Sequence, residues 1–213
     1  MQQIYTVGHS SQSIESFIAH LRRHGVEVVA DVRSHPYSAR FPHFSREPLQ
    51  ASLKAADIRY VFLGRELGAR REEAECYVDG QAVYSRIAKL PVFAAGIDRL
   101  LAGAQTYRVA LMCAEQDPLT CHRSILVCRE LRKHGASIKH ICRGGVLEEH
   151  QRAEQRLVEE ELGSADQRDM FAPAHSFTER LEQAYATRAG KIAYRRQPRS
   201  DDRPDDRAHS EIG

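Results

Sequence analysis

Five short apolar runs alternate with helical patterns along this chain, and this alternation limits the folds it can adopt. The runs are rich in β-branched residues and bounded by turn-forming residues, which is typical of buried strands. They are IYTVG (4–8), VEVVADV (26–32), IRYVFL (58–63), YRVALMC (107–113) and SIKHIC (137–142). Because strands that alternate with helices form parallel sheets covered on both faces, the sequence predicts a three-layer, Rossmann-like α/β fold with a mainly parallel sheet.

The segments between the runs have the periodicity of amphipathic helices. The first, IESFIAHLRRHG, presents one apolar face, with Ser13 as the expected N-cap and Gly25 as the expected stop. Further helices are expected over 48–56, over 82–103 with a break at a proline, and over 124–135.

Beyond the last run the sequence becomes strongly polar. VLEEHQRAEQRLVEEELG (146–163) is predicted to form one more helix and to end an α/β domain that spans 1–163. The segment 164–194 contains a further helical pattern and is expected to form an arm that packs back on the domain. The segment 195–213 has no apolar period and is predicted to be disordered.

Composition narrows the class of protein. The chain has 213 residues and a formal net charge of only +2, which does not favour nucleic acid as the partner. Its cysteines are odd in number and irregularly spaced, as is typical of a reducing compartment. No cationic and apolar leader and no membrane-length apolar run is evident, so a soluble, cytoplasmic protein without membrane partners is expected.

Polar side chains follow the predicted strands at the points where the strands end. In open parallel sheets the carboxyl ends of the strands meet at the edge that carries the ligand crevice. The residues at these ends are His9 and Ser10, Asp31 and Arg33, Arg65, and Cys113 and Glu115. Because their side chains are reactive or charged, we expect a functional site at this edge.

The stretch CAEQDPLTCHR lies between the fourth strand and the helix that follows it. Asp117 or Thr120 could cap that helix, which would place Cys121, His122 and Arg123 in its first turn. A helix N-terminus binds anions and lowers the pKa of a thiol. Cys121 is therefore predicted to be a nucleophile or a ligand, and Arg123 to neutralise an anion. The alternatives are a cysteine packed in the core and an arginine in a structural ion pair.

Two sets of side chains are assigned roles at this edge. The reacting groups are predicted to be Cys121, Cys113, Glu115, Asp31 and His9. The groups that bind substrate are predicted to be Arg33, Arg65, Arg123, His122 and Ser10. For Asp31 and Arg33, a structural pair that orders the following loop is an equally good hypothesis.

A metal is a less favoured alternative. Suitable ligand types are present in Cys113, Cys121, His122, His140, Cys142 and His150. The spacing C-x7-C-H, however, matches no compact zinc pattern, and a histidine inside a strand favours a core role. No metal ligand is assigned, and the cofactor stays unidentified.

The loop SHPYSARFPHFS (34–45) is long and rich in aromatic and basic residues. Such a loop could clamp a planar base or sugar, or it could form a surface lid packed by its own side chains. Neither G-x-G-x-x-G nor G-x-x-x-x-G-K-[ST] occurs in the chain, so the two standard nucleotide-binding fingerprints are lacking.

Taken together, the ordered motifs resemble a known family. TVGHSSQSIESFIAHLRRHGVEVVADVRSHPYSARFPHFS, YVFLGRELG, LMCAEQDPLTCHRSILVCREL and HICRGGVLEEH are similar to the bacterial and archaeal family called domain of unknown function 488. The resemblance covers about residues 3–150. It implies a compact α/β domain and points to the Cys-His-Arg motif at 121–123 as the functional feature. The resemblance implies no particular substrate.

The chain is therefore predicted to be an enzyme, a hydrolase or a transferase. Its substrate is expected to be an anionic small molecule or a nucleotide-like compound, bound at the carboxyl edge of the sheet. One alternative is a regulatory or repair accessory protein associated with nucleic acid. Another is a redox or metal sensor that uses Cys113 and Cys121.

Overall fold

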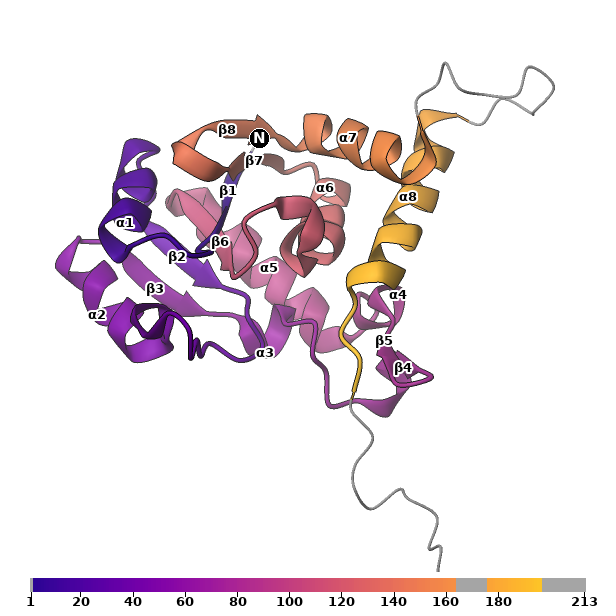
Figure 1. The fold of residues 1–213 in the computed structure, drawn as a ribbon, viewed down its shortest axis with the longest axis horizontal. Helices are drawn as coiled ribbons and strands as arrows, with labels where there is room; N and C mark the ends of the chain where they lie inside the picture. The colour runs from indigo at the N-terminus through magenta and orange to yellow at the C-terminus, as the bar shows by residue number, and fades with distance from the viewer. Residues whose placement is uncertain (1, 164–175, 197–213) are drawn as a thin grey trace, which may run out of the picture.

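A six-stranded sheet forms the centre of the computed structural model, which describes residues 2–163 and 176–196 (Figure 1). The strand order is β3-β2-β6-β1-β7-β8. The first five are parallel, and β8 runs antiparallel to β7. The strands are β1 (Gln3–Gly8), β2 (Val28–Asp31), β3 (Arg59–Phe62), β6 (Val109–Cys113), β7 (Ser137–Ile141) and β8 (Leu147–Glu149). All five predicted strands are confirmed.

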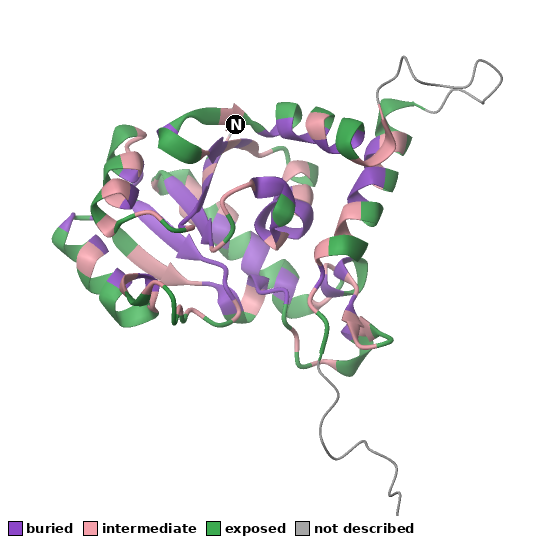
Figure 2. Ribbon diagram, in the orientation of Figure 1, coloured by how far each residue is buried: buried purple, intermediate pink, exposed green. Residues whose placement is uncertain are grey.

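Helices cover both faces of the sheet, so the predicted three-layer α/β class is confirmed. On one face α1 (Ile14–Arg23) and α2 (Arg46–Ala55) pack their apolar side chains against alternate residues of β1, β2 and β6. The other face is covered by α5 (Pro91–Thr106), the π-helical turn η4 (Arg123–Cys128) with α6 (Arg129–Lys133), α7 (His150–Leu162) and α8 (Phe177–Ile192). Figure 2 shows β2 and β6 buried between these layers, whereas the edge strand β3 is only partly buried.

Smaller elements occupy the connection between β3 and α5. They are α3 (Gly64–Leu67), α4 (Tyr84–Ile87) and a hairpin of β4 (Tyr77–Val78) and β5 (Gln81–Ala82). Single 3-10 turns lie at η1 (Pro42–Phe44), η2 (Ala74–Cys76), η3 (Pro118–Thr120) and η5 (Arg143–Gly145).

Local sequence signals account for both ends of α1. Ser13 caps α1 by accepting a hydrogen bond from the backbone N–H of Ser16 at 3.2 Å, and Gly25 follows the helix with φ +65°. The expected helix over 146–163 is wrong at its start, because Leu147 to Glu149 pair with β7 as the edge strand β8. Positive φ at Gly144 and Gly145 makes the tight turn between the two strands possible.

The strand order differs from the Rossmann order, in which the first two strands are neighbours. Here β6 lies between β1 and β2. The helix after β1 leads toward β2 at one side of the sheet, whereas the helix after β6 leads toward β7 at the other side. The connections from the adjacent strands β1 and β6 therefore run in opposite directions over opposite faces of the sheet, which makes the carboxyl ends of these strands a topological switch point.

The C-terminal helix α8 packs on the sheet-covering helices. Leu181, Ala184 and Tyr185 are buried in the same core as β6 and η4. Arg188 also pairs with Glu160 of α7 at 2.8 Å. The expected limits at 163 and 194 stay predictions, because residues 164–175, and residues 197–213 of the segment 195–213 that was expected to be disordered, lie outside the described residues.

Among the described helices, none is long and apolar enough to cross a bilayer.

Gly8 should be irreplaceable at the end of β1. A Cβ at this position would lie 1.8 Å from the carbonyl oxygen of Glu115, so Gly8→Ala must displace the loop after β6. We expect Gly8→Ala to lower the free energy of unfolding in urea by about 1–3 kcal/mol. The control is Gly103→Ala in α5, where a Cβ meets nothing within 4 Å. That variant should be neutral or stabilised by about 0.4–1 kcal/mol, and equal losses in both variants would contradict the argument.

Candidate functional site

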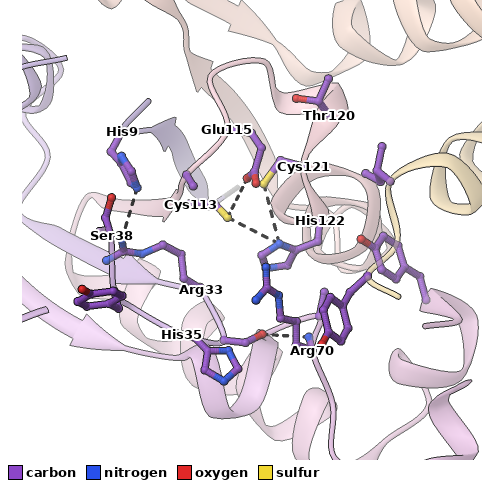
Figure 3. A pocket seen from close by; sticks show the side chains of 17 residues that line it. His9, Arg33, His35, Ser38, Arg70, Cys113, Glu115, Thr120, Cys121 and His122 are labelled. Carbon is purple, nitrogen blue, oxygen red and sulfur yellow. Dashed lines mark hydrogen bonds between the residues drawn. The ribbon is translucent and has the colours of Figure 1, made fainter. Parts of the chain in front are cut away.

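A cavity of about 420 Å³ opens at the carboxyl ends of β1, β2 and β6, at the topological switch point (Figure 3). Six of the residues that the sequence singles out line it: His9, Arg33, Cys113, Glu115, Cys121 and His122. They come from three segments that are far apart in the chain. The structure therefore brings these six residues together at one cavity, and their roles stay predictions.

The stretch between β6 and the next helix folds as two successive caps. The Asp117 carboxylate accepts the backbone N–H of Leu119 at 2.9 Å and caps the short turn η3, not the longer helix that it was predicted to cap. The chain is extended at Cys121 (φ −132°, ψ 141°), and helical geometry begins at His122. The carbonyl of Cys121 accepts the backbone N–H of Ser124 at 3.1 Å. Cys121, not Thr120, therefore caps the longer helix.

Two thiols, one imidazole and one carboxylate form a cluster in this cavity (Figure 3). Cys113 donates to Glu115 Oε2 at 3.2 Å, and Glu115 is exposed in the cavity. His122 Nδ1 lies 3.7 Å from Cys113 Sγ and 3.9 Å from Cys121 Sγ. His122 Nε2 lies 3.0 Å from the carbonyl oxygen of Val32. Because a carbonyl only accepts, Nε2 carries a proton and Nδ1 faces both sulfurs.

The cluster separates the charges of its members. Burial opposes ionisation of Cys121, but the neighbouring Cys113 thiol and the charge of Arg123 hold its pKa well below the usual range. The neighbouring Cys121 sulfur, together with burial, raises the pKa of Cys113. Burial lowers the pKa of His122, yet contact with Cys121 outweighs it and raises that pKa. Of the two thiols, Cys121 is therefore the one that ionises more readily.

Asp31 and Arg33 form a buried pair beside the cavity. Arg33 donates to the Asp31 carboxylate through Nε at 2.9 Å and through Nη2 at 2.7 Å, and Tyr60 donates to the same carboxylate at 2.8 Å. Asp31 is fully buried and does not line the cavity, which favours the structural alternative for this residue. Its effect is to hold the Arg33 guanidinium in one orientation.

His9 lies next to this pair. Its Nε2 is 3.4 Å from Arg33 Nη1, its Nδ1 donates to the carbonyl of Ser10 at 3.0 Å, and its ring stacks on Phe44 at 4.3 Å. Burial lowers the pKa of His9 to about 4, so the imidazole is neutral near pH 7.

Arg123 is buried behind the cluster and does not line the cavity. It donates to the backbone carbonyls of Glu115 at 2.6 Å and Gln116 at 3.0 Å, and through Nε to the Thr6 hydroxyl at 3.4 Å. These contacts engage all three nitrogens of its guanidinium. The structure therefore favours a structural role for Arg123 over the predicted contact with substrate.

Two other predicted residues are not brought to the cavity. Arg65 is exposed on α3. Ser10, with φ 45°, lines a neighbouring hollow together with Gln12, His20 and Arg143. Neither side chain is placed to bind a substrate that lies over the cysteines.

The cavity also contains residues that the sequence reasoning missed. Arg70 is exposed after α3, and its guanidinium lies 4.8 Å from the ring centroid of Tyr194. Tyr84 lines the same cavity. Arg70 belongs to GRELGAR, the loop after the third predicted strand. Its place after a strand end could therefore have indicated that Arg70 lies at the site. Tyr194 follows α8, and no local pattern indicated that it would return to this edge.

The aromatic loop contributes to both the cavity and the core. His35, Tyr37 and Ser38 line the cavity. Phe44 is fully buried and packs edge-on against Phe17 of α1. The clamp and the self-packed lid stay predictions for this loop, whose end at Phe44 is anchored in the core.

The remaining candidate metal ligands lie apart from the cluster. His140 Nδ1 is 2.7 Å from the Thr6 hydroxyl, and its Nε2 is 3.0 Å from His150 Nδ1. His150 Nε2 in turn lies 3.3 Å from the Tyr185 hydroxyl. Because both nitrogens of each ring have partners, these histidines form a core network. Cys142 contacts Glu148 at 3.8 Å.

Comparison with known proteins supports the resemblance seen in the sequence. The family model described as Domain of unknown function DUF488 matches residues 13–129. The chain belongs to this family. The matched segment contains β2, β3, β6 and the Cys113–His122 cluster, whereas β1 and α8 lie outside it. Neither the curated proteins nor the solved structures contain a significant match.

Removal of the Asp31 charge should be costly. Asp31→Asn leaves the Arg33 guanidinium buried without its counter-ion, so we expect the free energy of unfolding to fall by roughly 3–5 kcal/mol. Glu66→Gln is the matched control, because its partner Arg99 is exposed and the pair should contribute less than about 1 kcal/mol. Urea denaturation of both variants measures the two losses in the free energy of unfolding. Similar losses would show that the Asp31–Arg33 pair stabilises the fold no more than an ion pair at the surface.

The buried histidine network should make stability depend on pH. Burial lowers the pKa of His150 from 6.5 to about 4, so the unfolded state binds a proton more readily within that window. Stability should be constant above pH 6.5 and fall as the pH decreases toward 4, by on the order of 3 kcal/mol for this group. His150→Gln should flatten the fall, whereas His134→Gln at the exposed end of α6 should not. An unchanged slope in His150→Gln would refute the assignment.

Proposed function

We propose that the chain is an enzyme that catalyses hydrolysis or group transfer on a small anionic substrate held in this cavity. The observation that carries the proposal is that guanidinium groups and a cluster of reactive side chains line one cavity at the topological switch point. Polar groups that converge in a cavity of a few hundred Å³ are typical of small-molecule sites.

The anionic part of the substrate would meet two arginines. Arg33 is held by Asp31, which leaves Nη1 directed toward His9 at the cavity wall. Arg70 is exposed and contacts the face of Tyr194. A guanidinium with a fixed orientation matches the planar geometry of carboxylate and phosphate oxygens. Arg33 would fix the position of the anion, and Arg70 would close over it from the open side.

The reacting part of the substrate would lie over the Cys113–His122 cluster. Glu115 is exposed in the cavity and within hydrogen-bonding distance of a thiol, so it is placed to accept or donate a proton. The Cys121 thiolate lies beside His122, which the Val32 carbonyl orients. A nucleophile, a neighbouring base and a group that orients the base form the arrangement used in covalent catalysis.

A planar group on the substrate would find aromatic surfaces at the cavity mouth. Tyr37 lines the cavity and is 75% exposed, so its ring face is available for stacking. Tyr194, which follows α8 in the chain, also lines the cavity. Because arginines and aromatic rings line the same cavity, a nucleotide-like substrate is favoured over a simple inorganic anion.

Two alternatives from the sequence stay predictions. Binding to nucleic acid would show itself as affinity that falls steeply with salt. A redox or metal sensor would use the same pair of cysteines. The short distances from both thiols to one imidazole are compatible with this alternative.

The proposal can be tested with nucleoside 5′-monophosphates (AMP, CMP, GMP and UMP) as probes, by calorimetric binding and by release of phosphate, base or ammonia. We expect Arg70→Ala to weaken binding roughly 10- to 100-fold, since a charge-assisted hydrogen bond is lost. Arg40→Ala is the control, because Arg40 also lies over an aromatic ring but does not line the cavity. Glu115→Gln should lose turnover and keep binding, whereas Glu149→Gln on β8 should keep both.

If none of the four nucleotides binds and none is turned over, the nucleotide-like substrate is wrong. If Arg70→Ala and Arg40→Ala bind a probe equally well, the cavity is not the binding site.

A further inference from the structure

Three soft ligand atoms converge in the cavity. Cys113 Sγ, Cys121 Sγ and His122 Nδ1 all lie within 4.8 Å of one another, and this is the group of three possible metal ligands found among the described residues. With bonds of about 2.3 Å to sulfur and 2.0–2.1 Å to nitrogen, tetrahedral zinc places sulfur and nitrogen about 3.6 Å apart. The observed separations from Nδ1 are 3.7 Å to Cys113 and 3.9 Å to Cys121. An ion would therefore fit with little movement of the side chains.

The orientation of His122 also suits a metal ligand. Its Nε2 donates to the Val32 carbonyl at 3.0 Å, which directs the Nδ1 lone pair of the neutral ring toward the two sulfurs. Metal-bound histidines commonly donate their other N–H to a carbonyl in this way. A single Nδ1 can hydrogen-bond one thiol at a time, whereas a cation between the three atoms would satisfy all of them.

The surroundings of Cys121 stabilise bound thiolate. The backbone N–H of Arg123 lies 3.4 Å from Cys121 Sγ, at the start of the helix that Cys121 caps. Cys113 and Cys121 are each less than 5% exposed, so the sulfurs are screened from bulk water except on the cavity side. Such a site favours a cation that forms strong bonds to sulfur and nitrogen over Mg²⁺ or Ca²⁺, which prefer oxygen.

We propose that Cys113, Cys121 and His122 bind one zinc ion in the floor of this cavity. Three protein ligands leave one tetrahedral position for water or substrate, as in catalytic zinc sites. The cavity lies on that side, and Glu115 approaches Cys113 from it at 3.2 Å. Among the hydrolase and transferase mechanisms open to this site, bound zinc would favour attack by water over attack by the Cys121 sulfur.

The inference uses the cavity of the proposed enzyme but has a separate readout. The test is metal analysis of the purified full chain, followed by chelation under reducing conditions and titration of the apoprotein with Zn²⁺ and Co²⁺. We expect one zinc per chain. Cobalt should give the charge-transfer band of a thiolate ligand and the strong visible bands of tetrahedral coordination.

Variants assign the ligands. Cys113→Ser, Cys121→Ser and His122→Gln should each weaken zinc binding by more than about 100-fold, beyond the effect of a second-shell change. Cys142→Ser is the matched control, since Cys142 also contacts a glutamate but lies outside the cluster. It should bind zinc like the parent chain. Circular dichroism of each apoprotein separates loss of a ligand from loss of the fold.

Absence of zinc uptake and of the cobalt–thiolate band in the folded parent chain would overturn the metal site. If turnover were then found, with rapid alkylation of Cys121 at neutral pH, the proposed enzyme would stand with Cys121 as its nucleophile. Stoichiometric zinc with no binding or turnover of any nucleotide probe would keep the metal site and remove the substrate proposal.

Discussion

The site depends on the hydrogen bonds that the buried guanidinium of Arg123 donates to the loop after β6. The loop after β6 turns the carbonyl groups of Glu115 and Gln116 inward, and Arg123 donates to both. An unpaired buried carbonyl is costly, as is a buried cation without nearby negative charge. Here each group satisfies the other, and the Cys121 thiolate adds negative charge beside the guanidinium. The interaction thus fixes the loop that carries Cys113 and Glu115 against the helix that carries Cys121.

The C-terminal helices support this arrangement from behind. The Thr6 hydroxyl contacts both Arg123 Nε and His140 Nδ1. From His140 the network continues through His150 to Tyr185 of α8. The helix that supplies this tyrosine leads on to Tyr194 at the cavity. Helix α8 therefore contributes both to the core beneath the site and to its rim, although the family match ends before it.

Sequence reasoning was most accurate where local chemistry decides the structure. The apolar, β-branched runs became strands, Ser13 became the N-cap of α1, and polar residues from three strand ends met at one edge. Sequence reasoning failed where long-range contacts determine the secondary structure or the position of a side chain. The edge strand β8 is polar and reads as part of a helix, because only pairing with β7 makes it a strand. Arg65 follows a strand in the sequence, yet the short helix α3 leaves it on the surface.

The sequence by itself determined the α/β class, the edge on which reactive residues gather, and the identity of the two thiols and the imidazole. Tertiary structure alone decided which of those residues act together. The His122 ring is oriented by the Val32 carbonyl, 90 residues away in the chain, and Arg70 is brought beside Tyr194 by the return of α8. Propensity and periodicity act over a few residues. The geometry of a site depends instead on strand order and helix packing, which bring distant segments within hydrogen-bonding distance.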